Sequence, residues 1–422
     1  MLYQINHFND AIGLFLFVIY LYQVFYTVYA AVKHTRGKRR VVKKNPPLHR
    51  FAAVICARNE ENVIAELIGS LKTQDYPGEL LDIYVMADNC TDNTAAAARN
   101  AGATVFERFN TERVGKGYAL DDLFALLRRA HPLKAYDAFL VFDADNIVDA
   151  HFVSAMNETF CEGYDVITCY RNSKNFGANW ISASYSIWFL RESRFLNYPR
   201  MLLGTNCTIS GTGFLISGRI VEKNHGWPYF LLTEDIQFSA VCAMNGWRIG
   251  YCDQAIVYDE QPTSFRQSWR QRMRWSKGFY QVNGRYAAKL ALGCFTGKRR
   301  FSCYDMLMTI APCMLLTITA LLVNIFFLLS FLTRPRFIAI YVCKFILRRI
   351  GLGVLKAYVV LAAYALLTVV TEWRRIAASP VKKLQYVLAF PLFMFTYVPI
   401  SLAALVSKVE WKPIRHTSVE RA

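Results

Sequence analysis

The chain carries two kinds of hydrophobic pattern. Long apolar runs predict membrane-spanning helices, because each is close to the roughly 20 residues that cross a bilayer; they occupy residues 11–32, 306–332, 354–370 and 384–406. From Phe51 to about Asp259, short apolar runs alternate with helical patterns. The pattern therefore predicts a folded domain fused to transmembrane helices.

The folded region is predicted to be an α/β domain with a doubly wound, mostly parallel sheet, because its predicted strands alternate with helices. The strands are predicted at residues 51–57, 81–87, 103–109, 138–142 and 165–169, and a further apolar run lies at residues 214–217. Ligands of such sheets bind beyond the carboxyl ends of the strands. Asp88 and the pair Asp143 and Asp145 fall at such ends.

Basic residues predict how the chain is oriented. The linker at residues 33–50 carries eight Lys or Arg and no acidic residue. The positive-inside bias therefore places the amino-terminal span, within residues 1–32, with its start outside and the domain at residues 51–281 in the cytosol. Residues 282–302 mix aromatic and basic side chains, as an interfacial amphipathic helix would.

The topology of the carboxyl-terminal membrane region, residues 303–407, stays open. A segment near residues 334–352 is apolar but interrupted by Lys and Arg, which predicts an interfacial or re-entrant element between spans. If this segment does not cross, the basic tail at residues 408–422 ends up outside, against the charge bias.

Composition narrows the class of protein. The apolar fraction of 54% exceeds the usual globular share, and the net charge of +18 suits nucleic acid, an anionic membrane surface or an anionic substrate. Nucleic acid is the least favoured partner, because no zinc-finger spacing or RNA-binding signature is present and the basic clusters adjoin apolar spans. Eleven cysteines without a C-x-x-C pair indicate reduced thiols in a cytosol-facing protein.

One stretch combines carboxylates with many cations. It begins at Thr233-Glu234-Asp235 and ends at Gln271-Arg272-Met273-Arg274-Trp275, and residues 263–304 hold ten Lys or Arg and no acid. Such a layout suits a carboxylate base beside a polyanionic leaving group, for instance a nucleotide diphosphate. The alternative is an acidic first helical turn followed by arginines that face lipid head groups.

Three further positions suggest ligand contacts. Asp143 and Asp145 are one residue apart, so both carboxylates can turn toward one hard cation, Mg²⁺ or Mn²⁺, that bridges to substrate phosphates. Lys116 either neutralises phosphate or merely begins a solvated helix. Gly211 and Thr212 precede a short apolar run, where glycine permits either close backbone approach to a ligand or a tight turn.

The order of these motifs resembles that of the processive, membrane-embedded family 2 glycosyltransferases, which include cellulose, chitin and hyaluronan synthases and bacterial exopolysaccharide relatives. The motifs are Asp88, Asp143-Ala144-Asp145, Thr233-Glu234-Asp235 and Gln271-x-x-Arg274-Trp275. The resemblance covers roughly residues 51–281 and implies a cytosolic GT-A glycosyltransferase domain. It does not identify the sugar.

The resemblance also implies a role for each motif. Asp235 would be the general base of an inverting transfer. The donor nucleotide would contact Ala57, Arg58, Glu60, Asp88, Lys116 and Asp143; the metal would be held by Asp143 and Asp145; the departing diphosphate by Gln271 and Arg274; and the acceptor by Trp275, Glu234, Gly211 and Thr212. Ala87 stands where many relatives carry a second Asp, so only Asp88 is carried over from that motif, and Arg58 stands where relatives often have Tyr.

The resulting hypothesis is an integral protein of the plasma (inner) membrane that elongates a β-linked polysaccharide from cytosolic UDP-glucose or UDP-N-acetylglucosamine, and passes the polymer across the membrane. Four spans form a small path, so a second copy or an accessory export subunit would complete it. One alternative is a non-processive transferase that adds a single sugar to a membrane lipid. A second alternative, of another class, is a membrane protein that senses nucleotide sugars without transferring them.

Overall fold

A mixed eight-stranded sheet organises the region between residues 51 and 259. The protein is described by a computed structural model over residues 2–35, 46–130, 135–311, 313–331 and 335–409. The strand order is β3-β2-β1-β4-β7-β6-β8-β5, and parallel pairs join β3 through β4 and also β6 to β8. The strands are β1 (Phe51–Ala57), β2 (Leu81–Asp88), β3 (Thr104–Arg108), β4 (Ala138–Asp143), β5 (Ile147–Val148), β6 (Val166–Ser173), β7 (Phe214–Ser217) and β8 (Ile249–Asp259).

Strand β1 shows why the sequence of the central strands is apolar at nearly every position. Phe51, Ala53 and Ile55 belong to the core on one face of the sheet, under α2 and α5, whereas Ala52 and Val54 belong to the core under α4. Successive side chains of a strand point to opposite faces, so a strand covered on both faces is apolar throughout. The helices of this domain are α2 (Ile64–Lys72), the 3₁₀ turn η1 (Gly78–Leu80), α3 (Thr94–Asn100), α4 (Lys116–Ala130), α5 (Phe152–Phe160), α8 (Gly218–Lys223) and α9 (Glu234–Asn245).

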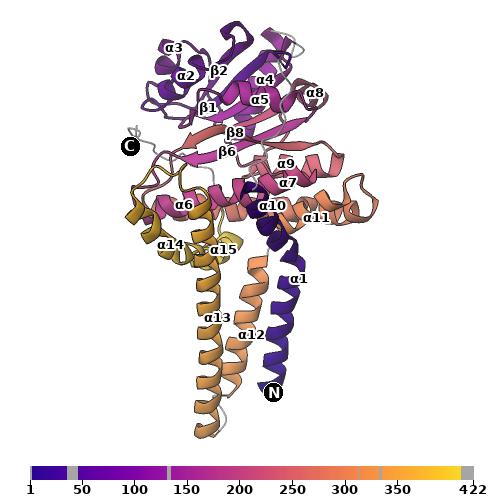
Figure 1. The fold of residues 1–422 in the computed structure, drawn as a ribbon, viewed down its shortest axis with the longest axis vertical. Coiled ribbons are helices and arrows are strands. Elements are labelled where there is room, and N and C mark those ends of the chain that lie inside the picture. Colours follow the sequence, from indigo (N-terminus) through magenta and orange to yellow (C-terminus); the bar gives the residue numbers. More distant parts are fainter. Residues whose placement is uncertain (1, 36–45, 131–134, 312, 332–334, 410–422) are drawn as a thin grey trace.

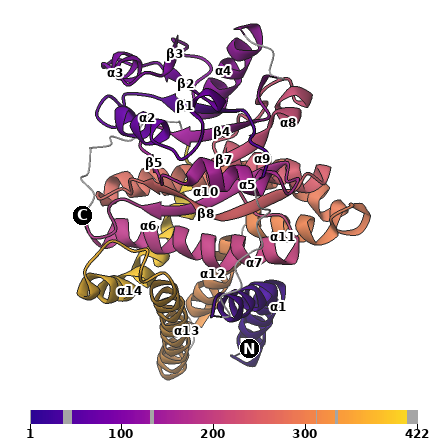
Figure 2. The ribbon, with the colours of Figure 1, turned by 45° about the horizontal axis from the view of Figure 1, so that its top comes forward.

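A helical layer lies between the sheet and the projecting helices (Figures 1 and 2). It includes α6 (Trp180–Arg191), the π-helical segment η3 (Glu192–Asn197) and α7 (Tyr198–Leu203). Asn179 caps α6, because its side chain accepts hydrogen bonds from the amides of Ile181 and Ser182. One face of α6 packs on the sheet and the other on α14, so the aromatic residues of this helix are core on both sides.

Helix α10 (Phe265–Thr296) is one continuous helix of 32 residues. The separate interfacial helix predicted at residues 282–302 is therefore wrong, because the first part of that range is the second half of α10. Val282, Tyr286 and Leu290 pack with α9 and α11 (Arg300–Ile310) in one apolar cluster. Burial against this cluster, at helical spacing, explains the aromatic and basic mixture that suggested an interfacial element.

The membrane-spanning segments also differ from their predicted bounds. The run predicted at residues 306–332 is broken at Ala311: its start belongs to α11, and α12 (Cys313–Phe331) follows. Helix α13 (Arg336–Thr371) is continuous, so the described part of the segment predicted as re-entrant or interfacial is the first half of one long helix. Helices α1 (Leu2–Thr35), α12 and α13 project from the same side of the domain (Figure 1).

The last predicted span forms two helices, α14 (Pro380–Phe395) and α15 (Tyr397–Val406). Among the described residues, three segments could cross a membrane by length and composition: Tyr3–Lys33, Arg336–Thr371 and Pro380–Val406. The apolar part of the third is 39% buried, against 6% for the other two, because α14 packs on α6 and α15 on α10. Most of the predicted basic linker and of the basic tail lies outside the described residues.

Candidate active site

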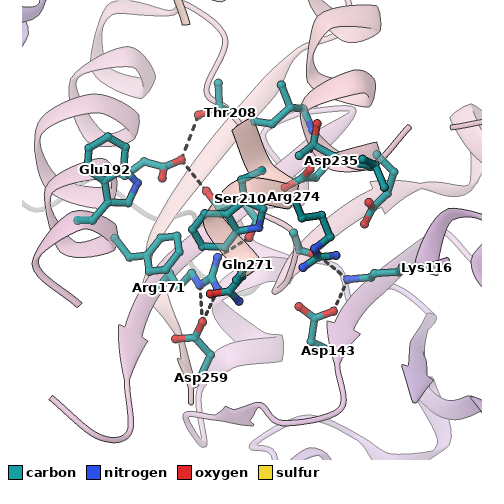
Figure 3. A pocket seen from close by; sticks show the side chains of 18 of the residues that line it. Lys116, Asp143, Arg171, Glu192, Thr208, Ser210, Asp235, Asp259, Gln271 and Arg274 are labelled. Carbon is teal, nitrogen blue, oxygen red and sulfur yellow. Dashed lines mark hydrogen bonds and ion pairs between the residues drawn. The ribbon is translucent and has the colours of Figure 1, made fainter. Parts of the chain in front are cut away.

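A cavity of about 450 Å³ lies at the carboxyl ends of β1, β2, β4, β6 and β8. Figure 3 shows side chains that converge on it from the sheet, from α4, from α9 and from α10. Every residue that the sequence assigned to the site lines this cavity, with the exception of Thr212. Residues as far apart in the sequence as Ala57 and Trp275 therefore share one pocket.

One end of the cavity is formed by the loops after β1 and β2, with Ala57, Arg58, Glu60 and Asp88. The two loops are tied together, because the Glu60 amide donates to the hydroxyl of Thr94 at 2.8 Å. Asp88 is 3% exposed and accepts a hydrogen bond from Arg108 at 2.6 Å. Burial raises the pKa of Asp88, and the guanidinium of Arg108 opposes the shift. Asp88 is thus fixed at the edge of the pocket.

Asp143 and Asp145 lie where β4 ends. The Asp143 side chain is 39% exposed and faces the cavity, whereas Asp145 is nearly buried and accepts a hydrogen bond from the amide of Glu260 at 3.2 Å. Thr212 lies behind this wall, 1% exposed: its hydroxyl accepts from the Asp143 amide at 2.9 Å and also bonds to Asn146. The predicted contact of Thr212 with an acceptor is therefore not available, and its hydroxyl instead fixes the end of β4.

The carboxylate oxygens at the end of β4 are suitable ligands for a hard divalent cation. Carboxylate oxygens are the ligands that Mg²⁺ and Mn²⁺ take, and Mg²⁺ is commonly held by one or two carboxylates plus substrate phosphates and water. Both Asp143 and Asp145 line the cavity. Within the described chain, no cluster of three or more His, Cys, Asp or Glu side chains is arranged to hold a metal. A cation here would consequently need phosphate or water oxygens to complete its coordination.

Lys116, the first residue of α4, lines the cavity and contacts the ends of two other segments. Its ammonium pairs with Asp143 and donates to the carbonyl of Gly211 at 2.6 Å (Figure 3). Burial lowers the pKa of Lys116, but the carboxylates of Asp143 and Glu234 outweigh burial and the net shift is upward. The side chain is 13% exposed, so the alternative of a solvated helix start is excluded, and the ammonium group lies in the wall of the cavity.

Asp235 and Glu234 occupy the first turn of α9. The Asp235 carboxylate accepts a hydrogen bond from the amide of Ile236 at 2.8 Å. Burial, and next the neighbouring Glu234 carboxylate, raise the pKa of Asp235 to about 7. Burial also raises the pKa of Glu234, with Lys116 opposing. A carboxylate whose pKa lies near neutrality is suited to accept a proton in a reaction at neutral pH.

Gln271, Arg274 and Trp275 lie on the face of α10 that lines the cavity. Their spacing of three and four residues places them side by side on a helix. Trp275 is half-buried and meets the rings of Tyr185 and Phe189 edge-on, with centroids 5.7 and 6.1 Å away. The Gln271 side-chain oxygen is buried without a hydrogen-bond partner among the described residues, so this motif offers a polar acceptor, a cation and an aromatic ring to a ligand.

Sequence reasoning missed an ion pair on the opposite wall. Arg171 near the end of β6 pairs with Asp259 at the end of β8, and donates to the carbonyl of Ser210 at 2.7 Å. Its guanidinium lies 3.6 Å from the centre of the Phe189 ring. Both charged residues lie near the ends of strands, the same signal that revealed Asp88, so Arg171 and Asp259 could have been found from the sequence.

The wall nearest the projecting helices was also missed. It contains Tyr20 and Gln23 of α1, Glu192 of η3, and Met308 and Thr309 of α11. The Glu192 carboxylate accepts from the hydroxyls of Ser210 at 2.5 Å and Thr208 at 3.3 Å (Figure 3). No local pattern signals these positions, because they reach the cavity only through the packing of α1 and α11 on the domain.

Comparison with known proteins adds to this geometry. Residues 46–278, more than half of the chain, match the protein family described as "Glycosyltransferase like family 2". The beta-monoglucosyldiacylglycerol synthase of Synechocystis sp. is 24% identical over 241 residues, which are 56% of this chain and 49% of that protein. Poly-beta-1,6-N-acetyl-D-glucosamine synthase of Staphylococcus aureus is 26% identical over 275 residues, which are 62% of this chain and 64% of that protein. The matches thus span about half to two-thirds of these curated relatives.

A solved structure shares the fold. The mannosyltransferase PcManGT from Pyrobaculum calidifontis, in complex with GDP-Man and Mn²⁺, matches with a TM-score of 0.53 at 16% identity, over 87% of this chain and 99% of that one. This likeness and the family match confirm the GT-A fold with its mostly parallel sheet. The finer resemblance to processive synthases stays a prediction. The chain belongs to glycosyltransferase family 2.

Proposed function

We propose that this enzyme transfers one sugar, with inversion, from a UDP-sugar to a hydroxyl group of a membrane lipid. The observation that supports this most directly is the extent of the cavity. It runs from the loops that carry Asp88, past Asp235, to Tyr20 and Gln23 on α1 and to Ala311, which directly follows α11. Since α1 is an apolar helix long enough to cross a bilayer, the acceptor end of the pocket opens at the membrane boundary.

In this proposal the donor occupies the sheet side of the cavity. Asp88 and the β1 loop contact the nucleoside, and Lys116 and Arg274 bind the diphosphate through charge-assisted hydrogen bonds. A divalent cation held by Asp143 and Asp145 would neutralise the charge that develops on the leaving diphosphate. Mn²⁺ accompanies the sugar nucleotide in the PcManGT complex, which supports the choice of metal.

Asp235 is proposed to act as the general base. The acceptor oxygen forms a bond to the anomeric carbon, the bond from that carbon to the diphosphate oxygen breaks, and the nucleoside diphosphate leaves with the electron pair. The proton of the acceptor hydroxyl passes to the Asp235 carboxylate. Attack from the side opposite the leaving group inverts the configuration, so an α-linked donor gives a β-linked product.

The membrane helices favour a lipid acceptor over a polymer. The apolar parts of α1 and α13 are only 6% buried, so the described helices of one copy leave most of their surface facing outward rather than enclosing a channel. Polymer elongation remains the second candidate, because Trp275 presents a half-buried ring to the cavity and a sugar ring can stack on such a face. The name of the Synechocystis relative, a glucosyldiacylglycerol synthase, agrees with the first candidate.

The experiment that tests the proposal is an assay of product size. The purified protein is incubated with radiolabelled UDP-glucose or UDP-N-acetylglucosamine, with Mg²⁺ or Mn²⁺, and with lipid extract in mixed micelles. We expect a labelled lipid that carries one sugar. A ladder of labelled chains would support polymer elongation and refute the lipid transferase, and UDP release without any labelled lipid or polymer would refute both.

A further inference from the structure

Arg191 lies at the membrane end of the cavity and takes no part in the proposed mechanism. It is the last residue of α6, it lines the cavity, and it is partly buried. Its guanidinium lies 5.0 Å from the Trp188 ring and 5.2 Å from the Tyr364 ring, and donates one hydrogen bond to Gln23 at 3.4 Å. Within the described chain, no carboxylate lies within ion-pair distance of it.

The next two arginines along the chain differ from Arg191, because each of them has a carboxylate partner. Arg194 pairs with Glu372, and Arg200 pairs with Asp305 at 2.6 Å. Both are almost completely buried, and both are neutralised by a carboxylate from a distant element. Arg191 alone of the three presents its charge to the cavity without a counter-ion. A cation held partly out of water between two aromatic rings is a binding site for an anion.

The residues around Arg191 indicate which kind of molecule carries the anion. Gln23 belongs to α1 and Tyr364 to α13, the two helices whose apolar parts are exposed. The apolar residues Leu196 and Met308 line the same end of the cavity. An anion that binds here therefore sits beside acyl chains, and a lipid phosphate meets both requirements.

Glu192, the residue that follows Arg191, contacts the loop next to Asp235 rather than the site at Arg191. Glu192 accepts hydrogen bonds from the hydroxyls of Ser210 and Thr208. The loop that carries Ser210 continues into Gly211, where an added Cβ would lie 3.5 Å from Asp235. The cavity thus joins an anion site at Arg191 to a base, Asp235, that acts on hydroxyl groups.

Resting on the proposed function, we propose that the acceptor is a phosphodiester lipid with a hydroxylated head group, whose phosphate binds Arg191 while its hydroxyl is presented to Asp235. The reaction is that already given: the head-group oxygen bonds to the anomeric carbon, the nucleoside diphosphate departs, and the proton goes to Asp235. The phosphate at Arg191 is bound and undergoes no change.

The test compares acceptors that carry the phosphate, the hydroxyl group or both. The full-length protein in phosphatidylcholine micelles is given labelled UDP-sugar and one of four acceptors: phosphatidylglycerol, diacylglycerol, a polyprenyl phosphate, or soluble glycerol phosphate. We expect phosphatidylglycerol to be glycosylated with a kcat/KM at least tenfold above that of diacylglycerol, which lacks the phosphate. Glycerol phosphate would be a poor acceptor, because the lipid end of the cavity stays empty. Polyprenyl phosphate, which lacks a hydroxyl, would be inert.

Variants of Arg191 separate binding from folding. Arg191→Gln is expected to raise the KM for phosphatidylglycerol about tenfold or more, with the KM for the donor unchanged and with Arg191→Lys intermediate. Arg285→Gln is the matched control, because Arg285 is an exposed arginine of α10 outside the cavity. Equal use of diacylglycerol and phosphatidylglycerol, or an unaltered acceptor KM in Arg191→Gln, would overturn the inference while the lipid transferase stands. A polymer product would instead refute the proposed function itself.

Discussion

At the scale of single residues, the proposed mechanism depends on one carboxylate whose protonation changes near neutral pH. The raised pKa of Asp235, about 7, arises first from burial and then from Glu234. Only the deprotonated form can accept a proton from the acceptor. Activity should therefore be retained above pH 7 and fall as the pH drops through 7, by about tenfold per unit below it.

This pH dependence is checked by measuring kcat/KM for the acceptor between pH 5 and 9, because that parameter reports groups of the free enzyme. Asp235→Asn should lower the rate by roughly 10²- to 10⁴-fold, the usual contribution of a general base. A kcat/KM that stays constant down to pH 5, as a carboxyl group with an ordinary pKa near 4 would give, would contradict the assignment. So would substantial transfer by Asp235→Asn at any pH.

At the scale of elements, the pocket depends on how closely α10 approaches the start of α9. Gly278 of α10 packs against Thr233: an added Cβ would lie 2.5 Å from the Thr233 side chain and 2.9 Å from its backbone nitrogen. Gly278→Ala should push the helices apart and displace Asp235 from Arg274. We expect a loss of about 1–3 kcal/mol of stability from overpacking, together with a fall in kcat.

The matched control lies on the same helix. An added Cβ at Gly284 meets nothing within 4 Å, so Gly284→Ala should gain the better helix propensity of alanine, up to about 1 kcal/mol. Thermal unfolding in detergent and sugar transfer are measured for both variants. If Gly278→Ala matched Gly284→Ala in both measurements, the close approach of α10 to α9 would not govern the site.

The candidate site also shows which of its residues can be predicted from the sequence and which cannot. Asp88, Asp143 and Asp145 could be predicted because strand ends meet at one edge of a parallel sheet, and Asp235 and Trp275 because their motifs resemble those of a family. Thr212 was misjudged, since sequence does not tell whether a side chain faces a ligand or the strand behind it. The bounds of the membrane segments were misjudged for a related reason: an apolar run at residues 306–332 looks the same whether its start packs on protein or on lipid.

At the scale of the whole molecule, buried ion pairs connect the projecting helices to the sheet. Glu372, just after α13, pairs with Arg194 and accepts a hydrogen bond from Tyr170 of β6 at 2.6 Å. Its side chain is 1% exposed. Glu372→Gln removes one of the two carboxylates that pair with Arg194, while Asp253 stays 3.2 Å away; losing this buried charged partner should cost about 1–3 kcal/mol and lower the unfolding temperature.

The control for this prediction is an exposed pair of the same chemistry. Arg99 and Glu107 form an ion pair with side chains 49% and 39% exposed, and such pairs contribute about 0–1 kcal/mol. Glu107→Gln should therefore leave the unfolding temperature nearly unchanged. Equal effects of the two substitutions would mean that α13 is not anchored to the sheet through Glu372.

The arrangement of the helices also resolves a conflict that the charge pattern alone left open. With α14 and α15 packed on α6 and α10, we expect only α1, α12 and α13 to cross the membrane. Helix α12 has 19 residues and is about 28 Å long, close to the roughly 30 Å of a bilayer core. Three crossings place the end of α15 on the side of the catalytic domain, in agreement with the positive-inside bias.

Reporter fusions test this topology, with one reporter that is active only in the cytosol and one that is active only outside it. A fusion after Ser407, which follows α15, should be active with the cytosolic reporter, and a fusion after Pro335, which precedes α13, with the outer one. If the Ser407 fusion were active outside, α14 and α15 would have to leave the base of the domain and cross the bilayer. The contact of Arg272 with Thr396, at 2.6 Å between α10 and the break before α15, would then be lost, and with it the packing behind the face that presents Gln271, Arg274 and Trp275.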